Sequence, residues 1–147
     1  MRSRFLFAMI AIASSSPAFA GDEGKALYLE TCSGCHQASG QGQPGLAPPL
    51  SDRALWGGLG DAKARYIAAV MLSGLNGTID AQGNRYEGLA MPPQSQLSDG
   101  QLASVATYVL DGLNGADAHV AADLLAALRQ KPLSHSEIRA MRAAAVK

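Results

Sequence analysis

Five consecutive residues, Cys32-Ser33-Gly34-Cys35-His36, carry the clearest chemical signal in this chain. The arrangement C-x-x-C-H is the sequence at which a c-type haem is attached. Two thiols on one turn of chain can form thioethers with the vinyl groups of one porphyrin. The histidine that follows is then held beneath the iron, where it can serve as the proximal axial ligand. Because Cys32 and Cys35 are the only cysteines of the chain, the motif predicts one covalent haem c and no structural disulfide.

The same two cysteines have alternative interpretations. A C-x-x-C redox disulfide would be expected beside a βαβ pattern, and this sequence offers no run of predicted strands. Half of a zinc site would need a second pair of ligands, which the sequence does not supply. A haem-free dithiol protein would be colourless, so the colour of the purified protein separates this alternative from a haem protein.

The second axial position of the iron decides what such a haem can do. A methionine there raises the reduction potential and suits electron transfer, whereas an open position suits gas binding or catalysis. Met91 lies in an extended segment and is followed by two prolines, which stiffen the backbone that would hold a weak thioether ligand. Met71 fits the buried face of a helix, and Met141 lies near the end of the chain. We therefore predict His36 and Met91 as the axial ligands, with a bis-histidine site through His119 or His135 as the alternative.

Helical patterns dominate the sequence that would position these residues, so the predicted fold class is all-α with long loops. A first helix is expected over about 22–31, leading directly into the C-x-x-C-H motif. A second is expected from Asp61, as its N-cap, to about residue 74. Its apolar side chains fall at i, i+3 and i+4 on one buried face: Ile67, Val70 and Met71. Between these helices, 40–49 is rich in Gly and Pro and predicts an irregular loop.

A further helix has clearer boundaries. Ser98 with Gln101 makes a capping box at its start, and Gly112 can close it. The preceding stretch, 77–88, contains few large apolar residues and predicts a short loop or hairpin.

Residues 116–147 are predicted to form a helical C-terminal extension beyond a domain at 21–115. Two helical stretches are expected near 117–130 and 135–145, the second opened by a capping box of Ser134 with Glu137. The extension could pack across the domain, dock a partner, or form a loosely attached amphipathic tail.

Residues 1–20 have the pattern of a secretory signal peptide. Arg2 and Arg4 make a positive n-region, an apolar run follows, and residues 18–20 form an A-x-A cleavage site. The apolar run is too short to span a bilayer, although an uncleaved anchor is the alternative. Covalent haem attachment in bacteria occurs on the outer side of the inner membrane, so the two signals together predict a periplasmic protein. No membrane span is expected after cleavage of the signal.

The charge balance excludes some classes of partner. The mature chain would carry 10 basic and 12 acidic side chains, which gives no indication of nucleic-acid binding. Residues 21–115 hold 5 basic and 9 acidic side chains, whereas 116–147 hold 5 basic and 3 acidic ones. An acidic domain with a basic extension could steer a charged partner, and an ordinary solvated surface is the alternative.

With these motifs in place, residues 22–114 resemble the class I cytochrome c family. Pro48-Pro49-Leu50 follows the haem motif as the family's P-x-L segment does. The resemblance implies that the Pro48 carbonyl accepts a hydrogen bond from the second ring nitrogen of His36, and that Leu50 packs on the haem. Gly24 and Tyr28, with Tyr108, look like the family's contact between crossing N- and C-terminal helices.

Within that family, the stretch from Gly74 to Pro93 looks like cytochromes that serve periplasmic dehydrogenases. Four residues are candidates to reach the haem propionates through N–H or O–H groups: Arg53, Trp56, Arg85 and Tyr86. Of these, Trp56 and Tyr86 are also included in the predicted haem pocket.

The resemblance implies a one-electron carrier rather than an enzyme, serving as a soluble partner or as the cytochrome subunit of an oxidoreductase complex. Its expected partners are redox proteins: a periplasmic dehydrogenase as donor, and another cytochrome or an oxidase as acceptor. The sequence shows no paired-carboxylate site, nucleophile elbow or phosphate loop. The alternative is a peroxidase-like haem enzyme or a gas sensor, which would need a displaceable sixth ligand and a distal acid–base residue.

Overall fold

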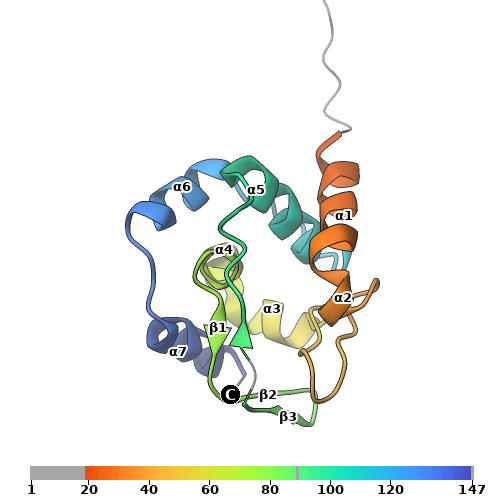
Figure 1. The fold of residues 1–147 in the computed structure, drawn as a ribbon, viewed down its shortest axis with the longest axis vertical. Coiled ribbons are helices and arrows are strands. Elements are labelled where there is room, and N and C mark those ends of the chain that lie inside the picture. Colours follow the sequence, from red (N-terminus) through yellow and green to blue (C-terminus); the bar gives the residue numbers. More distant parts are fainter. Residues whose placement is uncertain (1–18, 89, 147) are drawn as a thin grey trace, which may run out of the picture.

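The computed structural model describes residues 19–88 and 90–146, so most of the expected signal peptide lies outside the described residues. Helices make up most of this part of the chain (Figure 1), in agreement with the predicted all-α fold class. They are α1 (Phe19–Thr31), α2 (Ser33–His36), α3 (Arg53–Leu59), α4 (Lys63–Ser73), α5 (Asp99–Thr107), α6 (Ala122–Gln130) and α7 (His135–Ala145). A 3₁₀ turn, η1 (Gly60–Ala62), precedes α4, and a π-helical segment, η2 (Tyr108–Gly112), continues α5.

Two short antiparallel strand pairs complete the fold. β1 (Leu75–Asn76) pairs with β4 (Ala90–Met91), and β2 (Ile79–Ala81) pairs with β3 (Asn84–Tyr86). The second pair is the hairpin expected within 77–88, at the lower edge of the view in Figure 1.

Helices α1 and α5 cross at close range, as expected from the sequence. A Cβ atom on Gly24 would collide with the Ser104 carbonyl of α5, so only glycine permits this approach of the two backbones. Beside the crossing, the rings of Tyr28 and Tyr108 lie 5.3 Å apart and are tilted by 54°, a favourable geometry for an aromatic pair. The Tyr28 hydroxyl donates a hydrogen bond to the Gln37 carbonyl at 2.7 Å and so ties α1 to the loop that follows α2.

Helix α3 was not expected from the sequence. Asp52 caps it by accepting a hydrogen bond from the Leu55 backbone N–H at 3.1 Å. Its inner face buries three apolar side chains: Leu55, Trp56 and Leu59. Two adjacent glycines, Gly57 and Gly58, hide this short helix from a search for helical periodicity because both have low helix propensity.

The expected N-cap of the second predicted helix is wrong. Asp61 lies inside η1, and α4 begins at Lys63 without a side-chain cap. Gly60 ends α3 with a positive φ of 52°, and η1 then leads the chain directly into α4. The first N–H groups of α4 therefore follow a preceding helical turn rather than an extended segment that would call for a capping side chain.

Both predicted capping boxes are confirmed. Gln101 and Ser98 exchange hydrogen bonds at the start of α5, at 2.9 and 3.2 Å. Ser134 and Glu137 do the same at the start of α7. The other helix of the extension, α6, begins at Ala122, later than the expected residue 117.

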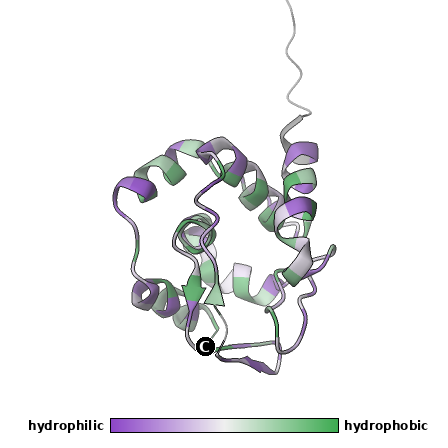
Figure 2. Ribbon diagram, viewed as in Figure 1, coloured by the Kyte–Doolittle hydropathy of each residue, from purple (hydrophilic) through white to green (hydrophobic). Residues whose placement is uncertain are grey.

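The C-terminal extension packs across the rest of the molecule. Helix α6 contacts α4 and α5, and α7 contacts α3, α4 and β1. Leu125 of α6 and Ile138 of α7 are fully buried, and Figure 2 shows hydrophilic and hydrophobic residues on different sides of both helices. At the crossing of α3 and α7, a Cβ atom on Gly58 would collide with the Ala145 carbonyl.

Within the described residues, none of the helices is long and apolar enough to cross a membrane.

Candidate functional site

One largely apolar cleft is bordered by all eight residues predicted for the site: Cys32, Cys35, His36, Pro48, Leu50, Trp56, Tyr86 and Met91. Its volume is about 1400 Å³, counted with the open space at its mouth. Helices α3 and α4 and the α5–η2 segment supply further walls, through side chains such as Leu55, Ile67 and Val105. An apolar cleft with few polar groups suits a flat, hydrophobic macrocycle.

The C-x-x-C-H motif lies where α1 passes into α2. The His36 backbone N–H donates to the Cys32 carbonyl at 2.9 Å, which folds the motif into a helical turn. Cys32 is half-buried and Cys35 is exposed, while His36 is only 7% exposed. Burial raises the pKa of the Cys32 thiol, although a hydrogen bond with Thr31 opposes this shift.

The His36 ring is oriented by the loop that follows it. Its Nδ1 lies 2.9 Å from the Pro48 carbonyl oxygen, the contact that the family resemblance implied. Since a carbonyl can only accept, Nδ1 carries the proton, and Nε2 keeps its lone pair for a metal. Burial lowers the pKa of His36, and the Pro48 carbonyl only partly offsets this shift. The site therefore favours the neutral imidazole, which is the form that binds iron.

The loop from Gly40 to Leu50 is irregular but closely held. The Gly40 carbonyl accepts hydrogen bonds from the Leu50 and Ser51 N–H groups at 2.7 and 2.8 Å. The Gly42 N–H donates to the His36 carbonyl at 2.9 Å. Gly42 has a positive φ of 69°, and a Cβ atom there would lie 2.6 Å from the Ala47 carbonyl oxygen. These contacts fix the Pro48 carbonyl in front of the His36 ring.

The Leu50 carbonyl is a junction that sequence reasoning missed. It accepts hydrogen bonds from the Trp56 indole N–H at 2.8 Å and from the Asn114 side-chain amide at 2.9 Å. The same amide donates to the Val109 carbonyl at 2.7 Å, and its oxygen accepts from the Asp52 N–H at 2.9 Å. Asn114 thus ties the cleft wall at residues 50–52 to the end of η2. In the sequence, Asn114 precedes Gly115 and indicates only the end of a helix.

The four candidates for propionate contacts divide into two groups. Tyr86 and Trp56 border the cleft, but the Trp56 N–H is already engaged with the Leu50 carbonyl. Arg53 is exposed and does not border the cleft. Arg85 is also exposed and forms ion pairs with Glu87 at 3.0 Å and with Asp80 at 3.7 Å.

Met91 is held by backbone contacts with the end of α4. In the β1–β4 pair it lies opposite Leu75. A Cβ atom on Gly74, whose φ is 69°, would collide with the Met91 carbonyl, so the two segments can approach this closely only with glycine. The Gln94 N–H donates to the Met71 carbonyl at 2.7 Å and anchors the chain beyond the two prolines. Met71 is buried in α4 as expected, but its side chain also borders the cleft.

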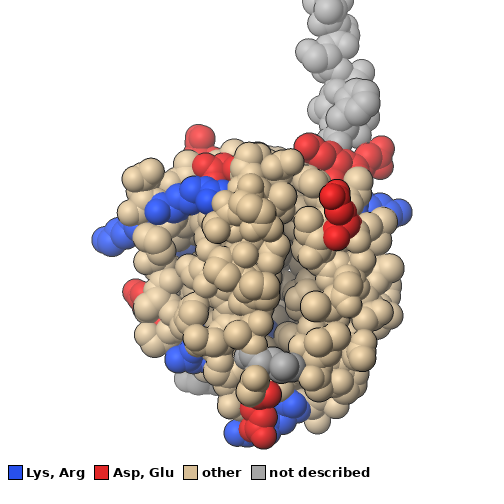
Figure 3. Space-filling view, viewed as in Figure 1, with Lys and Arg blue, Asp and Glu red and all other residues tan. Residues whose placement is uncertain are grey.

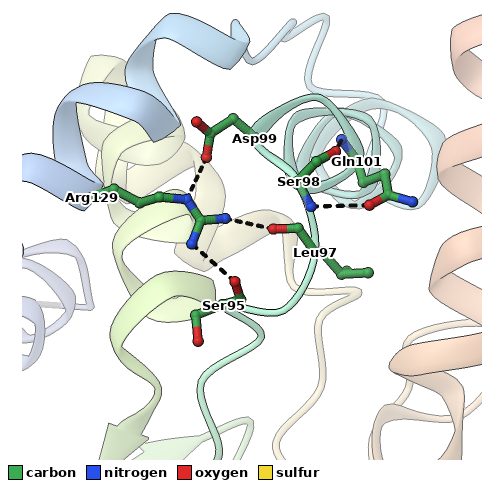
Figure 4. Close-up of polar contacts among 6 residues, drawn as sticks. All are labelled: Ser95, Leu97, Ser98, Asp99, Gln101 and Arg129. Carbon is green, nitrogen blue, oxygen red and sulfur yellow. Dashed lines mark hydrogen bonds and ion pairs between the residues drawn. The ribbon is translucent and has the colours of Figure 1, made fainter.

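Arg129 of α6 fixes the segment that connects Met91 to α5 (Figure 4). Its Nε donates to the Asp99 carboxylate at 2.6 Å. Its two Nη atoms donate to the Ser95 and Leu97 carbonyls at 3.0 and 2.5 Å. The extension therefore supports the methionine side of the cleft, although the sequence places Arg129 more than 30 residues away.

Comparison with known proteins identifies relatives of this arrangement. The family model for cytochrome c matches residues 21–112, a range that includes His36 and Met91. One cytochrome c-552 of Thermus thermophilus is 36% identical over 92 residues, covering 63% of this chain and 61% of the relative. A second Thermus thermophilus cytochrome c-552 is 36% identical over 87 residues, or 59% and 65% of the two chains.

The fructose dehydrogenase cytochrome subunit of Gluconobacter japonicus is 34% identical over 113 residues. This match covers 73% of the present chain but only 22% of that subunit. The chain thus spans less than two thirds of the length of each of these relatives.

Proposed function

Because the chain belongs to the cytochrome c family, which carries covalent haem c and serves electron transfer, we propose that it is a periplasmic one-electron carrier with His36 and Met91 as axial ligands. Cys32 and Cys35 would hold the haem through thioethers in the cleft. Pro48, Leu50, Trp56 and Tyr86 would line its pocket. When bound, the haem supplies a ferric/ferrous couple whose potential its axial ligands and surroundings set.

The observation that supports this proposal most strongly is the independent anchoring of both ligands around one cleft. The Pro48 carbonyl orients His36, and β1, Gly74 and the Met71 carbonyl hold the Met91 segment. None of these contacts needs to change when the charge of the iron changes. A site that keeps both ligands in both oxidation states reorganises little, which is what a carrier requires.

The mouth of the cleft suits a transient redox partner. Four residues that border the cleft and reach its surface carry no charge: Cys35, Leu46, Ala90 and Pro92. In Figure 3 a hollow runs down this face between mostly uncharged side chains, with an acidic group to the right of its upper end and most other charged groups nearer the edges of the view. Small, weak encounters are typical of electron-transfer partners. A dehydrogenase is our proposed electron donor, since one relative is the cytochrome subunit of fructose dehydrogenase.

Reversible redox titration of the haem-loaded protein tests this function. We expect a single one-electron transition, with six-coordinate spectra before and after reduction. We also expect slow binding of added carbon monoxide or cyanide, because Met91 must first leave the iron. A high-spin ferric spectrum with rapid ligand binding would contradict the carrier and favour a sensor or a peroxidase-like enzyme.

A further inference from the structure

A buried cation from the C-terminal extension forms part of the cleft wall. Arg142 of α7 is 5% exposed and borders the cleft. Among the described residues that border the cleft, Arg142 is the only Lys, Arg, Asp or Glu. Arg142 also lies beyond residues 21–112, the range matched by the family model.

The hydrogen bonds of Arg142 are incomplete. Within the part of the chain that the structure describes, its buried Nε has no hydrogen-bond partner. Its Nη2 reaches only the Asp80 backbone carbonyl, at 3.4 Å. A guanidinium is always charged and has five N–H donors, so burying it without an anion is costly.

Nearby carboxylates do not supply the missing partner. The Asp80 side chain is 71% exposed and lies 3.7 Å from Arg85 rather than pairing with Arg142. No ion pair joins Arg142 to any carboxylate of residues 19–88 or 90–146. A group bound in the cleft is in position to supply the missing partner.

We propose that Arg142 donates its Nε–H to a propionate carboxylate of the haem. This inference rests on the proposed function, because it requires the haem to occupy this cleft. The propionates are the carboxylates that haem brings to an otherwise apolar site, and a planar guanidinium matches their geometry. The C-terminal extension thus supplies a cofactor-binding residue in addition to its packing contacts.

Helix α7 is fixed well enough to place this side chain. Nε2 of His135, at the start of the helix, lies 2.9 Å from the Ser73 carbonyl. Arg139 donates to the Asn76 carbonyl at 2.8 Å and to its side-chain oxygen at 3.1 Å. Ile138, one turn before Arg142, is fully buried. Lys131 is a cation of the same extension that is exposed and does not border the cleft, which makes it the matched control.

The first test compares reduction potentials of haem-loaded wild type, Arg142→Gln, Arg142→Lys and Lys131→Gln. Removing a cation beside the haem favours the more positive ferric form. We therefore expect Arg142→Gln to shift the potential downward, Arg142→Lys to retain most of the wild-type value, and Lys131→Gln to leave it unchanged. An unchanged potential in Arg142→Gln, or an equal shift in Lys131→Gln, would overturn the proposal.

The second test needs no variant, so it tests the contact between Arg142 and a propionate even if Arg142→Gln does not fold or does not take up haem. A crystal structure of the haem-loaded wild type should place Nε of Arg142 within hydrogen-bond distance of a propionate oxygen. Propionates bound elsewhere, with Arg142 directed away from them, would refute it. The absorption spectrum of the same sample reports His/Met ligation, so failure of the proposed function would be recognised separately.

Discussion

Replacing Asn114 by alanine should destabilise the protein more than its small size suggests. The side chain is 5% exposed and makes three hydrogen bonds, to the Leu50 and Val109 carbonyls and from the Asp52 N–H. The Leu50 carbonyl would lose the hydrogen bond from Asn114 but keep the one from the Trp56 indole, so this carbonyl would remain partly satisfied. The buried Asp52 N–H would lose its side-chain acceptor, and an unsatisfied buried donor costs about 1–3 kcal/mol.

Because the Leu50 and Val109 carbonyls also lose a donor, the effects add. We expect Asn114→Ala to lower the free energy of unfolding by about 2–4 kcal/mol in total. For a chain of this size, that corresponds to a fall of roughly 10 °C in the melting temperature. Thermal and guanidinium unfolding of the haem-loaded protein, followed by far-UV circular dichroism, measure the change. Asn84→Ala is the matched control, because the Asn84 amide is exposed and donates only to the Gln82 carbonyl. Equal melting temperatures for the two variants would refute the role assigned to Asn114.

Two further substitutions test contacts that hold the cleft. Gly24→Val should destabilise the fold by about 3 kcal/mol or more, because its side chain would meet the Ser104 carbonyl at the α1–α5 crossing. Gly57→Ala, where a Cβ atom meets no neighbour, should be neutral or slightly stabilising in the same melting experiment, and equal effects would contradict the crossing argument. Arg129→Gln should cost about 1–3 kcal/mol and speed the displacement of Met91 by added imidazole, measured by stopped-flow absorption. Imidazole binding at the wild-type rate would show that Arg129 does not support the methionine segment.

Local sequence signals predicted the parts of this fold that depend on neighbours along the chain. The capping boxes at Ser98 and Ser134 each join residues three apart and were found correctly. The helix missed at 53–59 and the wrong N-cap at Asp61 share one cause. A short capped helix that passes through a 3₁₀ turn leaves no periodic pattern long enough to detect.

The cleft could be predicted as a set of residues but not as a geometry. The spacing of the C-x-x-C-H motif and the prolines after Met91 indicated residues that the fold brings to one cavity. Asn114 and Arg142 were missed because their roles depend on contacts across about 60 residues of sequence. A basic residue four positions after the apolar Ile138 was the one available sign that Arg142 faces inward.

The most direct test of the central claim is the ferric absorption spectrum of the haem-loaded protein in the near-red region, where methionine sulfur on ferric haem gives a weak band. Met71→Leu is the matched control, since Met71 is a second methionine bordering the cleft. We predict that wild type and Met71→Leu show the band and that Met91→Ala lacks it. A band that survives in Met91→Ala, or disappears in Met71→Leu, would contradict His36/Met91 ligation.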